Sequence, residues 1–78
     1  MNILSQNGKA LINYNNIISI NMESTENIWN IKVTYNGGLY IILAAFYTED
    51  ECKNTFDKLC NKIKMSRESD TIDLGEVL

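Results

Sequence analysis

Hydrophobic and polar positions alternate over much of the first half of the chain, which is typical of strands with one buried face. Residues 28–35 show this best, since Trp29, Ile31, Val33 and Tyr35 alternate with polar residues. In residues 17–22, Ile18, Ile20 and Met22 are expected on one face. Further strands are predicted at residues 3–5, 10–14 and 39–46.

Turn residues separate these segments. Asn7-Gly8 predicts a type I′ turn, because both central positions of that turn need a positive φ. Asn15-Asn16 predicts a second tight turn, and residues 36–38 close a later hairpin with two glycines. Residues 23–27 are expected to form a polar loop. Short connections of this kind join neighbouring antiparallel strands, so the pattern indicates a meander.

The segment 39–46 is apolar on both faces of the predicted strand. Its two faces are Leu39, Ile41, Leu43 and Ala45 on one side and Tyr40, Ile42, Ala44 and Phe46 on the other. Only one face can pack against a helix of the same chain, so the other needs a cover. A second copy of the chain, joined face to face or edge to edge, would supply it. We therefore expect a homodimer.

A helix is predicted over residues 49–65. Thr48 is placed to be its N-cap, and Glu51, three residues on, completes a capping box. Tyr47 and Cys52 then occupy the two positions whose side chains meet in a hydrophobic staple. The spacing of the apolar residues predicts one buried stripe, formed by Cys52, Phe56, Leu59, Cys60 and Ile63.

The predicted fold is therefore α+β, an antiparallel meander of four to five strands with one C-terminal α-helix packed on the sheet. Residues 1–65 form its single domain and carry six lysines against six acids. Residues 66–78 hold four acids and one arginine, which accounts for the net charge of −3. These last residues are predicted to be a flexible acidic tail. In an alternative interpretation, Ile72 and Leu74 belong to a linear motif that adds a strand to a sheet edge.

The residue types argue against catalysis and metal binding. With no histidine, a zinc site would need both Cys52 and Cys60, which lie about 12 Å apart on a helix. The same separation excludes a disulfide between them. The acids at residues 49–51 are explained by the positive end of the helix. We expect no enzyme, cofactor, metal or small-molecule substrate.

Charge and hydropathy constrain the partners and the location. Without a basic stripe, nucleic-acid binding is not expected. No apolar run reaches the roughly 18 residues of a membrane span, and the first residues lack the pattern of a signal peptide. Two cysteines that cannot pair within the helix fit a reducing compartment. The expectation is a cytoplasmic protein without membrane contact.

Three local motifs carry a resemblance. They are the opening Ile3-Leu-Ser-Gln-Asn7, the segment Ile12-Asn-Tyr-Asn-Asn16 and the junction Tyr47-Thr-Glu-Asp-Glu51. Together they resemble a family of short proteins of low-GC Gram-positive bacteria and their phages, which have no established activity. The resemblance covers residues 1–65 and departs at Ala44-Ala45-Phe46, where relatives tend to have a glycine and an acid. It implies the same fold and a phage or mobile-element origin, and it supplies no functional residue.

The function predicted from these observations is a non-enzymatic interaction module that acts through protein contacts, with a protein partner or a second copy. Tyr40, Ile42, Ile72 and Leu74 are the candidate contact residues. The alternative is an acidic inhibitor of a host nucleic-acid-handling protein, in which the acids of residues 66–78 imitate phosphates.

Overall fold

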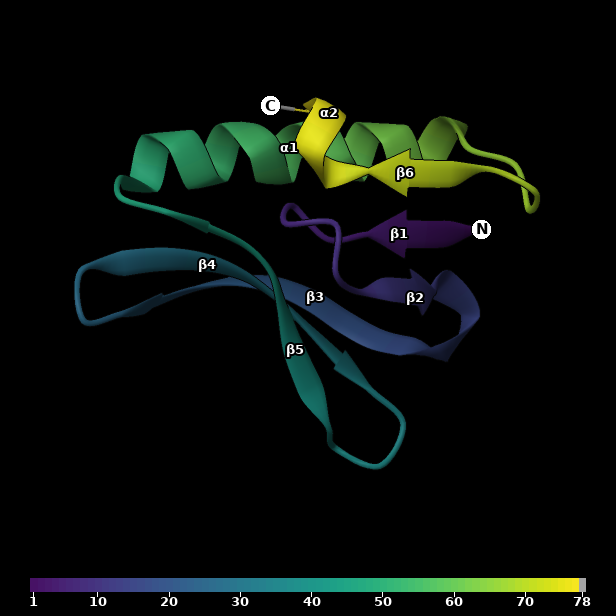
Figure 1. The fold of residues 1–78 in the computed structure, drawn as a ribbon, viewed down its shortest axis with the longest axis horizontal. Helices are drawn as coiled ribbons and strands as arrows, with labels where there is room; N and C mark the ends of the chain where they lie inside the picture. The colour runs from purple at the N-terminus through teal and green to yellow at the C-terminus, as the bar shows by residue number, and fades with distance from the viewer. Residues whose placement is uncertain (78) are drawn as a thin grey trace.

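The computed structural model describes residues 1–77, and these form six strands in two sheets with a long and a short helix (Figure 1). The elements are β1 (Asn2–Leu4), β2 (Leu11–Asn13), the 3₁₀ turn η1 (Tyr14–Asn16), β3 (Ile17–Thr25), β4 (Ile28–Tyr35), β5 (Tyr40–Phe46), α1 (Glu49–Met65), β6 (Thr71–Asp73) and α2 (Leu74–Val77). The large sheet has the order β3-β4-β5, and the small sheet has the order β2-β1-β6. The predicted α+β fold, with a strand meander and one main helix packed on it, is confirmed.

The turn chemistry differs from the prediction at two places. At Asn7-Gly8 only Gly8 has a positive φ (72°), so the turn is not type I′. The Asn7 side chain instead accepts hydrogen bonds from the Ser5 hydroxyl and the Lys9 N–H. The predicted polar loop at residues 23–27 is also shorter than expected, because β3 continues to Thr25. Glu26 and Asn27, with φ of 49° and 67°, form the two-residue connection and have the backbone that a type I′ turn requires.

Two β-bulges change which side chains share a face. The register of β3 against β4 shifts between Ile17 and Ser19, which leaves Ile18 as the extra residue. Ile18 is 63% exposed, so its predicted place beside Ile20 and Met22 was wrong. On β5, Ile42 pairs with Lys32 while Ala44 pairs with Ile31, so Leu43 is the extra residue there.

The bulge at Leu43 mixes the two predicted faces of β5. The register places Ile41, Ala44 and Phe46 on the face that packs against α1. Leu43 is buried as well, whereas Tyr40, Ile42 and Ala45 are exposed on the other face. A bulge shifts the alternation of side chains by one residue, so a prediction that assumes strict alternation assigns the residues beyond it to the wrong face.

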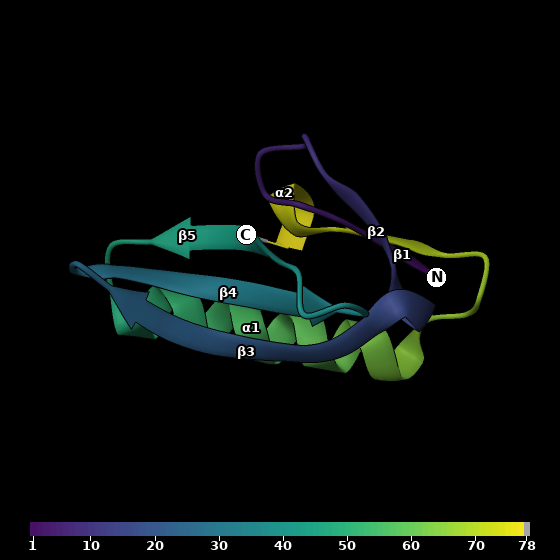
Figure 2. The ribbon, with the colours of Figure 1, turned by 90° about the horizontal axis from the view of Figure 1, so that it is seen from below.

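Helix α1 covers one face of the large sheet, and in Figure 2 it lies behind β3 and β4. Its predicted stripe is confirmed for four of five residues, since Cys52 and Leu59 are fully buried and Phe56 and Ile63 pack against the same core. The fifth, Cys60, is only half-buried. The predicted N-cap is present, because Thr48 Oγ1 accepts the Glu51 N–H at 3.2 Å. The capping box is incomplete, because the Glu51 carboxylate accepts from the Thr48 hydroxyl in place of the Thr48 backbone N–H. The hydrophobic staple was wrong, because Tyr47 is 85% exposed.

The C-terminal segment is folded. β6 pairs in parallel with β1, so that Ile72 lies beside Ile3, and α2 packs against α1 and β1. Ile72 and Leu74 are buried in the same core as the large sheet. The predicted flexible tail is therefore wrong for residues 71–77, because these apolar side chains leave water and the β1 edge gains a partner. The segment does add a strand to a sheet edge, but the edge belongs to its own chain.

One residue joins the two sheets. The Gln6 N–H donates to the Leu43 carbonyl at 2.8 Å, and the Gln6 side-chain oxygen accepts the Ala45 N–H at 3.0 Å. Gln6 thus takes the place of a neighbouring strand beside the bulge of β5.

Candidate functional site

Tyr40 and Ile42 lie on the face of the large sheet that points away from α1. Tyr40 is opposite Thr34 and Ile42 is opposite Lys32 in the β4–β5 register. The two side chains are 61% and 41% exposed, and the preceding Leu39 is 66% exposed. We call Leu39, Tyr40 and Ile42 the β5 strip. It consists of three large, exposed apolar side chains at and just before the start of β5.

A charged side chain sits beside the β5 strip. The Lys32 Nζ lies 4.8 Å from the centre of the Tyr40 ring, and it also pairs with the Glu23 carboxylate at 2.9 Å. The cation is attracted to the face of the ring, by about 0.5–1 kcal/mol at an exposed site. Because the charge of Lys32 is matched by Glu23, this part of the surface is neutral. Sequence reasoning missed both residues, since only the strand register brings Glu23, Lys32 and Tyr40 together.

The edge of β5 is only partly available. Among residues 1–77, no strand pairs with β5 on the side away from β4. The bonds from Gln6 to Leu43 and Ala45 nevertheless occupy that edge near the end of the strand. A partner strand could therefore reach only the part next to Tyr40 and Ile42.

The other two predicted contact residues have a different place and role. Ile72 and Leu74 belong to β6 and α2, and both are buried. They cannot contact a partner while the chain is folded, so their assignment as contact residues was wrong. The four candidates do not form one site, and only Tyr40 and Ile42 remain on the surface.

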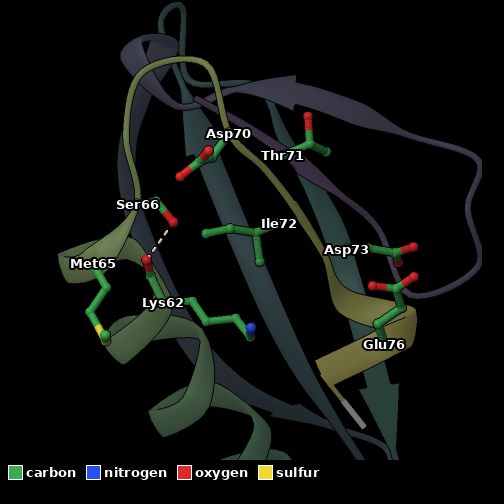
Figure 3. A pocket seen from close by; sticks show the side chains of 8 residues that line it. All are labelled: Lys62, Met65, Ser66, Asp70, Thr71, Ile72, Asp73 and Glu76. Atoms are coloured by element: carbon green, nitrogen blue, oxygen red, sulfur yellow. Dashed lines mark hydrogen bonds between the residues drawn. The ribbon is translucent and has the colours of Figure 1, made fainter.

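A hollow of about 330 Å³ lies between the end of α1 and β6 (Figure 3). It is lined by Lys62, Met65, Ser66, Asp70, Thr71, Ile72, Asp73 and Glu76.

The carboxylates of this hollow do not converge. Figure 3 shows Asp70 at one end of β6 and Asp73 with Glu76 at the other. Asp70 accepts the Arg67 N–H at 2.7 Å, and Asp73 accepts the Gly75 N–H at 2.8 Å, so both stabilise turns of the backbone. Within the described part of the chain, no group of three His, Cys, Asp or Glu side chains could hold a metal ion. Asp70 and Asp73 therefore stabilise the fold, which weakens the case that the acids of residues 66–78 imitate phosphates.

The cysteines offer no reactive pair. Both are free, as the helical spacing predicted. Burial raises the pKa of the Cys52 thiol, which favours the protonated and poorly nucleophilic form. Cys60 is half-buried on the same helix. Cys52 therefore acts as a small core residue.

Comparisons of the chain with known protein families, with characterised proteins and with solved structures find no match. The resemblance to short proteins of Gram-positive bacteria and phages stays a prediction. Over residues 1–77, the structure contains no helix that is both long and apolar enough to cross a membrane.

Proposed function

We propose that this protein is a non-enzymatic interaction module that acts through protein contacts on the β5 strip, and that its first partner is a second copy of the chain. The supporting observation is the exposure of Leu39, Tyr40 and Ile42, at 66%, 61% and 41%. Adjacent large apolar side chains in water favour association, because burying them is stabilising. The resemblance and the free cysteines support a phage-related, cytoplasmic protein.

The geometry around the β5 strip favours a face-to-face contact over an edge-to-edge one. Gln6 occupies the backbone groups of Leu43 and Ala45, which shortens the edge that a second β5 could pair with. The Lys32–Glu23 pair keeps the sheet face neutral, so two copies meet without repulsion between like charges. A stable dimer buries roughly 800 Å² per partner, so polar residues around the strip must join the contact.

Sedimentation velocity over a range of concentrations, up to high micromolar, tests this proposal. The fraction of the natural chain that sediments as a dimer should grow with concentration. The double variant Tyr40→Lys/Ile42→Lys should remain a monomer. Leu11→Lys is the matched control, because Leu11 is also 60% exposed but belongs to β2 of the small sheet. A natural chain that stays monomeric throughout, or a dimer that the double variant retains, would contradict the proposal.

A further inference from the structure

The second edge of the large sheet is β3, and it is open. β3 spans nine residues, and within residues 1–77 no strand pairs with it on the side away from β4. It contains no proline, and its one charged side chain, Glu23, is tied to Lys32. Natural proteins usually protect such an edge, as Gln6 does for β5. The open β3 edge is therefore the better template for an added strand.

The pairing pattern shows which backbone groups this edge presents. A two-residue turn connects Thr25 to Ile28, and in such a hairpin the pair next to the turn is hydrogen-bonded. Bonded and non-bonded pairs then alternate along the ladder. Ser24, Met22 and Ile20 occupy the non-bonded positions, so their N–H and C=O groups point away from β4. An extended chain beside β3 would find three evenly spaced pairs of donors and acceptors.

A groove runs beside the first residues of this edge. It has a volume of about 380 Å³ and lies between the start of β3 and the C-terminal half of α1. Consecutive residues from Ile17 to Ile20 line it, because they lie on an edge strand and the bulge at Ile18 breaks the alternation of side chains there. Figure 2 shows the last turns of α1 extending past β3 on this side. The other walls are formed mainly by Tyr14, Cys60, Ile63 and Lys64.

The chemistry of the groove indicates what would fill it. Its walls are mostly apolar, and Ile18 at the bulge is 63% exposed. Among the described residues that line it, Lys64 is the one that carries a charge. Neither of the two ion pairs found in residues 1–77 includes Lys64. An apolar groove with an unmatched ammonium group at its rim complements an apolar segment that carries a carboxylate.

We propose that this groove binds an extended peptide of a partner protein, which adds a strand to β3. Main-chain hydrogen bonds to Ile20, Met22 and Ser24 would provide affinity, and alternate apolar side chains of the peptide would enter the groove. A carboxylate of the peptide lies near Lys64. This site is separate from the β5 strip and does not depend on what binds there.

A second copy of the chain fits this edge less well. Two copies paired antiparallel through β3 would place both α1 helices on the same side of one continuous sheet. The last turns of α1 already extend past β3 and would meet the partner's helix (Figure 2). A single strand needs only about 4.8 Å beside β3, so it can enter where a whole domain cannot.

A random-peptide phage library, selected on the immobilised full chain, tests the proposal. Enriched peptides should alternate apolar and polar residues and carry an acid. The most enriched peptide is then labelled and titrated by fluorescence anisotropy. Hydrogen exchange of the complex should show new protection at the Ile20, Met22 and Ser24 amides.

Two variants and two matched controls locate the site. Ile18→Lys should weaken peptide binding by about tenfold, because it places a charge at the apolar groove. Lys64→Glu should weaken it by about fivefold, the upper range for an exposed ion pair. Leu11→Lys is the control for Ile18→Lys and adds a lysine at an exposed site on the small sheet. Lys58→Glu is the control for Lys64→Glu and reverses a charge on the other flank of α1. Both controls should bind within about twofold of the natural chain.

Four results would overturn the proposal. The first is a library that yields no enriched peptide, and the second is an enriched peptide that binds Ile18→Lys as tightly as the natural chain. The third is protection on binding at Tyr40–Ile42 in place of β3. Finally, a dimer that is lost in Ile18→Lys but kept in Tyr40→Lys/Ile42→Lys would show that a second copy occupies this edge.

Discussion

At the residue scale, single polar side chains of this protein accept hydrogen bonds from backbone N–H groups in turns, at a helix start and at a strand edge. The Thr48 hydroxyl accepts the Glu51 N–H at the start of α1, and the Asn7 side chain accepts the Lys9 N–H in the first turn. Gln6 does the same for the Ala45 N–H on β5. Each bond satisfies a donor that regular secondary structure leaves unpaired. Thr48 and Asn7 act within their own turn, whereas Gln6 acts across 39 positions of sequence.

Thr48→Ala tests the cap at the residue scale. We expect the free energy of unfolding to fall by about 1 kcal/mol, because the Glu51 N–H loses its acceptor. Urea denaturation followed by Trp29 fluorescence measures the change. Ser69→Ala is the control, since the exposed Ser69 side chain makes no hydrogen bond within residues 1–77. Equal stability of the two variants would show that the cap contributes nothing.

At the scale of elements, β6 depends on the rest of the fold. It has three residues and one neighbouring strand among the described residues. Such a strand is not stable by itself, so its place depends on packing. Ile72 lies beside Ile3, and Leu74 continues into α2, which contacts α1 and β1. Burial of the Ile72 and Leu74 side chains therefore stabilises the position of β6 more than its hydrogen bonds to β1 do.

Ile72→Ala tests whether β6 belongs to the core. Removing the buried side chain should lower the free energy of unfolding by roughly 2–5 kcal/mol, as is usual for a core isoleucine. Thermal and urea unfolding measure the loss. Thr71→Ala is the adjacent control, because Thr71 is exposed and should change stability by less than about 0.5 kcal/mol. If residues 71–74 were not packed in the core, Ile72→Ala and Thr71→Ala would change the free energy of unfolding by the same small amount.

At the scale of the whole molecule, the two sheets share one core. Ile3 and Ile72 from the small sheet, Ile31 from the large sheet and Leu59 from α1 belong to a single buried cluster. A chain of 78 residues buries too little apolar surface to support two independent cores. The small sheet and the large sheet should therefore stabilise each other.

This shared core predicts one cooperative unfolding transition. Native-state hydrogen exchange should give the same free energy of opening for the Ile3 amide in β1 and the Ile31 amide in β4. The Tyr47 amide, in the exposed connection before α1, should open at much lower free energy and serves as the internal control. If Ile3 exchanged several kcal/mol more easily than Ile31, the small sheet would be a separate unit.

The candidate surfaces were only partly predictable. Tyr40 and Ile42 were named from the two-sided apolar pattern of their segment, and both are exposed. Their neighbour Lys32 was read only as a polar position on a strand, because its contact with the Tyr40 ring depends on the β4–β5 register. The groove beside β3 was not predicted. It depends on the bulge at Ile18 and on the path of α1, which no local pattern specifies.

Elements whose signals are local could be predicted from the order of residues alone. The period of two in β4, the apolar stripe of α1 and the cap at Thr48 depend on residues only a few positions apart. Tertiary structure decided the rest: the bulges at Ile18 and Leu43, the bonds from Gln6 to β5 and the docking of β6. These features take their free energy from contacts between residues far apart in sequence. Such contacts form only when the strands and the helix have come together, so no spacing along the chain could show them.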